Sequence, residues 1–321
     1  MTEHKTVQKP LWGLILGLSL NVYPYTLVMA NTEFCQEQSQ AASAAAAKLD
    51  FSTLVQIRAQ VRDPCPGNFF TYVENLMTQV AGTKAQDEFA QGRVAKANDW
   101  LAQAPTTAWY TLALQGDIAA QNREWANAAR YYNIALDLNP PPDFATELAA
   151  LAGQATVLSG TLVASVQRSG NGMGLYNIRG SYASIPAPIQ FDFDQDTLTA
   201  DGKASTERLA AYVKRRLQQQ SQLVVTIVGH TDSRGSDAYN CDLSLRRAAT
   251  VQRIIKGVLQ NEARDLISKL TIQGQGERVP YPISSMAQPL TAEERFALDR
   301  RVEVLFTNVN YSPSTNSCVS N

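Results

Sequence analysis

The chain has 321 residues, and its 28 lysines and arginines nearly balance 29 aspartates and glutamates, for a formal net charge of −1. This balance provides no basic field for nucleic acid, and we expect no nucleic-acid partner. The length favours two domains over one, and a hydrophobic share of 45% is ample for sizeable cores.

Residues 1–30 have the pattern of a secretory signal peptide. Lys5 and Lys9 give a positive start, Leu11–Leu20 is an apolar core of signal-peptide length, and Val28–Ala30 ends in a small residue suited to cleavage. Polar and helix-breaking residues interrupt the apolar run, which disfavours a spanning helix. An uncleaved membrane anchor stays open as the alternative.

Four cysteines follow the signal peptide, namely Cys35, Cys65, Cys241 and Cys318. An even count behind a secretory signal indicates disulfides in an oxidising compartment. Three connectivities are possible. Proximity within each domain favours Cys35–Cys65 and Cys241–Cys318, and free thiols are the alternative. No spacing of the cysteines matches a zinc site, and we expect neither a metal nor another cofactor.

Residues 31–165 are predicted to form an all-helical domain, because alanine-rich and periodic stretches dominate it. Within residues 109–142, small and aromatic residues resemble the pattern of a tetratricopeptide repeat: Leu112, Gly116, Trp125, Ala128, Tyr132, Ala135 and Pro140. The resemblance implies stacked antiparallel helices of a kind that binds peptides or proteins. We therefore expect this domain to recruit another envelope protein, with simple packing of the aromatic residues as the alternative.

Residues 166–186 have a glycine-rich linker composition, and residues 309–321 are predicted to be a C-terminal tail. Between them, residues 187–308 alternate strands and helices. The expected strands are Ile189–Phe193, Leu223–Val228, Leu270–Ile272 and Val302–Phe306, with a short one at Tyr182–Ile185. The expected helices are Leu198–Leu217, one starting near Leu243, and Thr291–Leu298, which Thr291 and Glu294 could cap. This order predicts a βαβαβ-type domain with a mixed sheet, so the whole chain is α+β.

Asp232 follows the predicted strand Leu223–Val228, and Arg247 lies in the first turns of the helix that returns. At about 100° per residue, Arg247 borders the apolar stripe of that helix, whereas Arg246 points away from it. A guanidinium at the edge of a core is costly to desolvate unless an anion meets it. Together, Asp232 and Arg247 could hold a ligand that carries both an ammonium and a carboxylate. The alternative is a structural salt bridge between them or with other side chains.

The stretch Gly229-His230-Thr231-Asp232-Ser233-Arg234-Gly235 has further motifs around it in a fixed order. They are Phe191–Asp194 upstream, then Asn240, Leu243-Ser244 and Arg247-Ala248, and later Gly274–Glu277 and Arg300–Glu303. This ordered set, over residues 187–308, resembles the signature of the OmpA-like peptidoglycan-binding domain. Several spaced motifs in the right order are more specific than any one of them.

The resemblance implies that the domain holds the meso-diaminopimelate of a peptidoglycan stem peptide, with Asp232 on its ammonium and Arg247 on its carboxylate. It also implies secondary pocket positions at Asp194, Asp196, Asn240 and Arg300, and a backbone contribution from Thr231. The sequence departs from the family pattern at Asp299, where many members carry asparagine, and at Arg295, an arginine displaced along its helix. Both departures bear chiefly on Arg300.

No nucleophile–base pair or metal cluster accompanies these motifs, so we expect no enzymatic activity, and the resemblance to the family implies binding of the cell wall. The expected protein is periplasmic and associated with the cell wall or outer membrane of a Gram-negative envelope, and peptidoglycan is its expected ligand. Two alternatives stay open. One is a stator or tether with an inner-membrane anchor, and the other is an adaptor whose OmpA-like module has lost wall binding.

Overall fold

The computed structural model describes residues 32–159, 184–187, 189, 191, 194–220, 222–262, 264–284, 289–308 and 318. The expected signal peptide and most of the expected linker and tail lie outside these residues, so those assignments stay predictions. The chain divides into two compact units, Met1–Ile118 and Ala119–Asn321. The last helices of the expected helical domain therefore fall in the same unit as the sheet.

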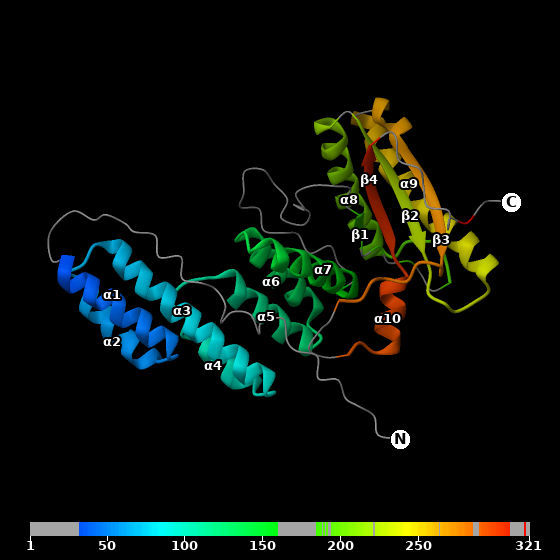
Figure 1. Cartoon of the computed structure of the whole chain (residues 1–321). Helices are drawn as coiled ribbons and strands as arrows, with labels where there is room; N and C mark the ends of the chain where they lie inside the picture. Colours follow the sequence, from blue (N-terminus) through cyan, green and yellow to red (C-terminus); the bar gives the residue numbers. More distant parts are fainter. Residues whose placement is uncertain are drawn as a thin grey trace, which may run out of the picture. The chain divides into compact units, whose positions relative to one another are not determined.

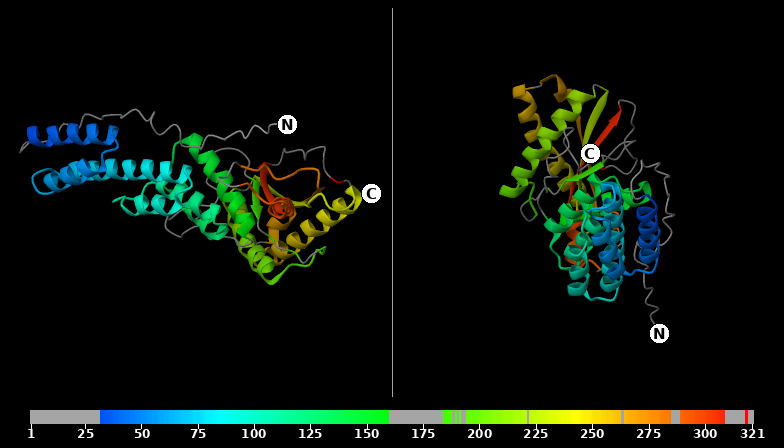
Figure 2. Two further views of the ribbon diagram at one scale, coloured as in Figure 1. Left: turned by 90° about the horizontal axis from the view of Figure 1, so that it is seen from below. Right: turned by 90° about the vertical axis from the view of Figure 1, so that its left-hand side faces the viewer.

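The first unit is entirely helical in its described part. Its helices are α1 (Thr32–Ala47), α2 (Phe51–Val61), α3 (Gly67–Ala90), α4 (Val94–Ala102) and most of α5 (Trp109–Gln121). Figures 1 and 2 show α1, α2 and α3 lying side by side, and their apolar faces share one core. The disulfide Cys35–Cys65 joins α1 to the loop before α3, in the pairing that the sequence favoured. It ties two neighbouring segments of this small core together.

Local sequence explains where these helices begin and end. The Asp50 side chain accepts a hydrogen bond of 3.1 Å from the backbone N of Thr53, which caps the start of α2. Proline residues lie between α2 and α3, where a helix cannot continue. The helical character of this region is confirmed, and the tetratricopeptide assignment over residues 109–142 stays a prediction.

The second unit combines two helices with a mixed sheet and its covering helices. In chain order its elements are α6 (Trp125–Asp137), α7 (Pro142–Ser159), β1 (Ser184–Ala187), α8 (Ala200–Gln219), β2 (Leu223–His230), α9 (Asp237–Glu262), the 3-10 helix η2 (Arg264–Lys269), β3 (Leu270–Gly276), α10 (Ala292–Asp299) and β4 (Val302–Asn308). The strand order is β1-β4-β2-β3, with β2 and β3 parallel and the other pairs antiparallel (Figure 1). The α+β class and the mixed sheet are therefore confirmed.

The first strand of the sheet lies earlier than the expected Ile189–Phe193 and overlaps the short strand expected at Tyr182–Ile185. It is β1, which pairs Ile185 with Val304 of β4. Phe191 forms only an isolated bridge with Leu198, while Ile189 is buried and Phe191 packs against the core. At its two described apolar positions, Ile189 and Phe191, the stretch 189–193 thus packs against the core, whereas pairing with β4 determines where β1 lies.

Helices α8 and α9 pack against each other and against the sheet, and this contact forms the core of the second unit. Leu209, Val213 and Leu217 of α8 are buried, as their helical spacing predicted. On α9 the buried stripe ends at Leu259, and Val258 is only partly buried. β2 is one of the two inner strands of the sheet, flanked by β3 and β4, and nearly all of its residues are buried. A fully flanked strand is a rigid base for the residues at its end.

Helix α10 connects the sheet to the α6–α7 pair of the same unit. The expected capping box is present, since the Thr291 side chain and the Glu294 side chain each bond the other's backbone N–H. A small core on α10 and its approach includes Leu290 and Leu298 and packs against Val157 of α7. The backbone N of Ser284 also donates to Gln154 Oε1 of α7 at 2.9 Å. These contacts fix the helix whose end leads directly to Arg300.

Within the described residues, none of the helices combines the length and the apolar composition that crossing a membrane requires.

Candidate ligand-binding site

Helix α9 starts directly over the ends of β2 and β3, and two glycines permit this approach. A Cβ atom on Gly229 would lie 2.0 Å from the carbonyl oxygen of Ser244. A Cβ atom on Gly274 would lie 2.7 Å from Ser244 Oγ. Only glycine leaves room for a backbone this close. The motif glycines therefore set the distance between the strand ends and the helix that carries Arg247.

The second expected disulfide holds the same corner. Cys241 lies near the start of α9 and is bonded to Cys318, as the sequence favoured. The backbone N of Cys318 donates to the carbonyl oxygen of Gly274 at 2.8 Å. One residue near the C-terminus is thereby attached to both α9 and β3, beside the loop that follows β2.

Asp232 lies in that loop and is only 5% exposed. Its Oδ1 accepts hydrogen bonds from the backbone N and the Nε of Arg234, at 3.0 and 3.2 Å. Its Oδ2 accepts from Arg234 Nη2 at 2.6 Å and from Arg300 Nη1 at 2.8 Å. Burial opposes a charge on this carboxyl, but the bonds from Arg234 and Arg300 outweigh it and keep the pKa of Asp232 below its ordinary value. Asp232 is therefore an anion at neutral pH.

Arg247 is also only 5% exposed, but it has a different set of partners. Its Nε donates to the carbonyl oxygen of Gln195 at 3.0 Å, and its Cζ lies 5.0 Å from the centre of the Phe191 ring. Burial, followed by repulsion from Arg300, lowers the pKa of Arg247, and Asp232 partly offsets this effect. Among the described residues, nothing accepts a hydrogen bond from its two Nη groups.

The structural alternative is found in part. Among the described residues Asp232 and Arg247 do not form a salt bridge with each other, but Asp232 does form salt bridges with other side chains, those of Arg234 and Arg300. The Asp232 and Arg247 side chains still interact through their charges. The neighbouring Arg246 is only partly buried and pairs with Asp242, so the expected difference between the adjacent arginines is confirmed. A buried carboxylate and a buried guanidinium thus lie in one site without neutralising each other.

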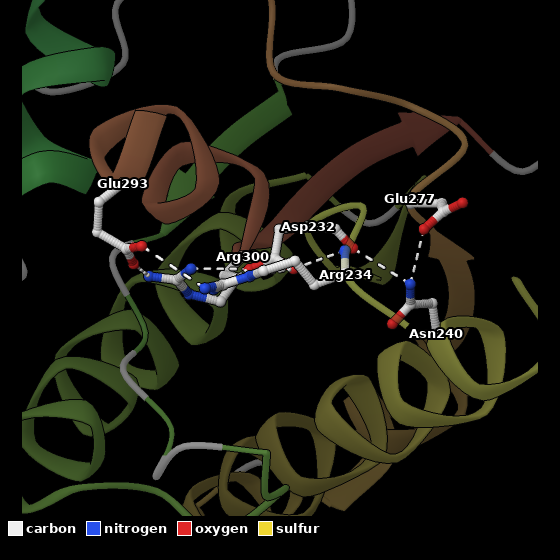
Figure 3. Close-up of polar contacts among 6 residues, drawn as sticks. All are labelled: Asp232, Arg234, Asn240, Glu277, Glu293 and Arg300. Atoms are coloured by element: carbon white, nitrogen blue, oxygen red, sulfur yellow. Dashed lines mark hydrogen bonds and ion pairs between the residues drawn. The ribbon is translucent and has the colours of Figure 1, made fainter. Parts of the chain in front are cut away.

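The secondary positions divide into two groups. Asn240 Nδ2 donates to the backbone oxygen of Asp232 at 3.2 Å and to Glu277 Oε2 at 2.7 Å, and Arg300 contacts Asp232 directly (Figure 3). Thr231 donates its backbone N to the oxygen of Gly276 at 2.9 Å. Asn240, Arg300 and Thr231 therefore fix the loop that carries Asp232 through their hydrogen bonds.

Asp194 and Asp196 lie on the other side, before α8. Asp194 accepts a 2.7 Å hydrogen bond from the Tyr239 hydroxyl, has a positive φ of 57°, and acts on Arg247 through its charge. Asp196 lies 3.8 Å from Arg246 and shows no contact with Asp232 or Arg247 among the described residues. Asp196 is therefore the most peripheral of the expected site residues.

A family model described as the OmpA family matches residues 190–300. Residues 190–300 are an OmpA family domain. Outer membrane porin F of Pseudomonas aeruginosa is 38% identical over 119 residues, which cover 37% of this chain and 30% of the porin. Outer membrane protein A of Shimwellia blattae is 30% identical over 132 residues, which cover 40% of this chain and 51% of that protein. The chain thus spans about half or less of these relatives.

Two solved structures are also similar over this region. One is the peptidoglycan-associated lipoprotein of Burkholderia pseudomallei, with 24% identity and a TM-score of 0.29, covering 37% of this chain and 88% of the lipoprotein. The other is the periplasmic domain of Helicobacter pylori MotB, with 18% identity and a TM-score of 0.30, covering 40% of this chain and 82% of the other.

The structure adds polar residues to the OmpA family domain that the sequence did not assign to the site. Arg234 makes most of the contacts to Asp232, and its Cζ lies 4.6 Å from the centre of the Phe296 ring on α10. Glu293 accepts from Arg300 Nη2 at 2.8 Å and lies 3.6 Å from Arg234 Nη1. The sequence could have indicated the contact of Arg234 with Asp232, because Arg234 lies two residues after Asp232 in a turn, where an aspartate often bonds the backbone two residues on. Glu293 had no comparable local signal.

The two departures from the family pattern leave Arg300 in place. Asp299 Oδ1 accepts a 2.8 Å hydrogen bond from the backbone N of Tyr281, which an asparagine oxygen could equally accept. Arg295 is exposed on α10. Arg300 reaches Asp232 in spite of both changes.

His230, at the end of β2, predicts a pH dependence of stability. Burial, followed by the charge of Arg301, lowers its pKa from 6.5 to about 4. The imidazole is therefore neutral in the fold, while the unfolded chain takes up a proton near pH 6.5. Stability is complete above about pH 6.5 and falls as the pH drops toward 4. We expect urea denaturation to show this fall.

His230→Gln should reduce that fall, because glutamine does not titrate. The comparison of the two pH profiles separates His230 from the carboxylates, which titrate in both proteins. If the free energy of unfolding fell equally between pH 7 and pH 5 in both proteins, His230 would not contribute to the pH dependence of stability.

Proposed function

We propose that the OmpA family domain binds peptidoglycan non-covalently through the meso-diaminopimelate of a stem peptide. One observation carries the proposal. Arg247 is a buried guanidinium whose Nη groups have no acceptor among the described residues, and it shares its site with the ionised Asp232. A largely buried charge without a direct ion pair is costly, so a ligand carboxylate would stabilise it.

The free end of diaminopimelate carries an ammonium and a carboxylate on one carbon. Asp232 would accept from the ammonium, and the guanidinium fork of Arg247 would hold the carboxylate. Charge-assisted hydrogen bonds of this kind contribute roughly 1.5–3 kcal/mol each. Arg300 and Asn240 would position Asp232. Asp194, Asp196 and the Thr231 backbone would line the rest of the binding site. The chemistry is binding, since no group in this arrangement acts as a nucleophile.

We further propose that the helices of the N-terminal unit recruit another protein of the cell envelope. Phe34 on α1 and Val55 on α2 are exposed apolar side chains, which suit a protein surface. The names of the curated relatives, outer membrane porin F and outer membrane protein A, support a place in the envelope. The protein would then link peptidoglycan to its partner.

Sedimentation with purified diaminopimelate-type peptidoglycan tests the wall-binding proposal. We expect the full chain to sediment with the polymer, and Asp232→Ala and Arg247→Ala to reduce this strongly. Arg253→Ala is the control, because it removes one exposed positive charge from the same helix α9.

The other outcomes separate the alternatives. If the wild type binds and neither substitution weakens binding, the residue assignment is wrong. If the wild type does not bind at all, the adaptor alternative is favoured. Intact residues 1–30 in protein purified from membranes would favour the anchored tether.

A further inference from the structure

The carboxylate of Asp232 is already saturated with hydrogen bonds. Arg234 contributes three of them, through its backbone N, Nε and Nη2, and Arg300 contributes the fourth. Two carboxylate oxygens offer about four lone-pair sites. An incoming ammonium therefore needs one of these donors to leave before it can bond to Asp232.

The two arginines differ in how readily they can leave. The Arg234 side chain is 47% exposed and belongs to the short loop between β2 and α9. The Arg300 side chain is 31% exposed and lies between α10 and β4, with Glu293 at 2.8 Å as its second partner. Movement of the Arg234 side chain would vacate one site on each oxygen of Asp232, while its backbone N–H could stay bonded.

Other partners for the Arg234 side chain lie close by. Its Nη1 lies 3.6 Å from Glu293, and its guanidinium already lies against the Phe296 ring. Figure 3 shows the Arg234 and Arg300 guanidinium groups close together between Asp232 and Glu293. Two like charges this close repel each other, which favours release of the more exposed one. After release, Arg234 would keep a carboxylate and an aromatic face as partners.

We propose that Arg234 occupies the ammonium position of the ligand in the unbound domain and acts as an internal competitor that sets affinity. The inference rests on the proposed function, because it assumes that Asp232 receives a cation. Only a ligand with a positive charge next to its carboxylate can replace all the hydrogen bonds that Asp232 loses when the Arg234 side chain leaves. The binding-competent state is then a fraction of the unbound protein, and the apparent affinity is lowered by that fraction.

Calorimetric titration of the full chain with free meso-diaminopimelate tests this inference. We expect Arg234→Ala and Arg234→Gln to bind several-fold to about tenfold more tightly than the wild type, as removal of one partly exposed ion pair implies. Arg253→Ala, with the same loss of charge, should bind as the wild type does. Thermal unfolding of each variant checks the fold.

A wild type that binds while both Arg234 variants bind equally or more weakly would overturn the inference and leave the proposed function intact. Binding by the Arg234 variants with none detected for the wild type would support it. No binding by any of the four proteins would overturn the proposed function, and the inference with it.

Discussion

Arg247→Lys is expected to weaken binding of meso-diaminopimelate by roughly tenfold to a hundredfold, although the positive charge is kept. Lysine presents a compact ammonium and cannot form the planar fork that matches a carboxylate. It would also lose the Nε bond to Gln195 and the stacking on Phe191, which hold the guanidinium in position. Calorimetric titration of the full chain measures the change.

The matched control for this substitution is Arg253→Lys, an exposed exchange on the same helix that should leave affinity unchanged. Thermal unfolding should show that both variants stay folded at the temperature of the titration. Wild-type affinity in Arg247→Lys would mean that charge alone is recognised, and the role given to the fork would be wrong.

Gly229→Ala is expected to destabilise the OmpA family domain by about 3 kcal/mol or more, near the upper end for overpacking. The added Cβ would lie 2.0 Å from the Ser244 oxygen and 2.8 Å from its carbonyl carbon. Both atoms belong to the backbone, so relief requires helix α9 to move away from β2. The same movement would carry Arg247 away from Asp232, and ligand binding should fall with stability.

Hydrogen exchange of the β2 amides measures this effect within the full chain. The control is Gly257→Ala, in α9 itself, where an added Cβ would meet nothing within 4 Å. Gly257→Ala should leave the stability of the domain unchanged or raise it by up to about 1 kcal/mol, because glycine is unfavourable inside a helix. If Gly229→Ala were as stable as Gly257→Ala, the close approach of α9 would not be a constraint on the site.

Local sequence was sufficient where a short stretch determines the structure by itself. The period of α9 predicted that Arg247 is buried and Arg246 more exposed, and Thr291 with Glu294 predicted the start of α10. The first strand was predicted only in part: the short strand expected at Tyr182–Ile185 overlaps β1, but β1 runs to Ala187, and its extent depends on pairing with β4. Ile189 and Phe191 looked like strand residues, but they pack against the core without lying in a strand of the sheet.

The same distinction applies to the site. Asp232 and Arg247 could be predicted because each lies at a recognisable place, one after a buried strand and one beside an apolar stripe. The contact from Arg300 to Asp232 could not, since it depends on where α10 packs 68 residues further along the chain. Glu293 belongs to the same case, because only the fold brings it to Arg234 and Arg300. Charge networks built from distant segments are not encoded in local patterns.

The most direct measurement compares two stem tripeptides that differ only in their last residue, meso-diaminopimelate or lysine. Both carry an ammonium for Asp232, but only the diaminopimelate peptide has the adjacent carboxylate that Arg247 would hold. We predict that the full chain binds the diaminopimelate peptide and binds the lysine peptide at least tenfold more weakly. Equal binding of the two peptides would contradict the account, because Arg247 would then have no role in recognition.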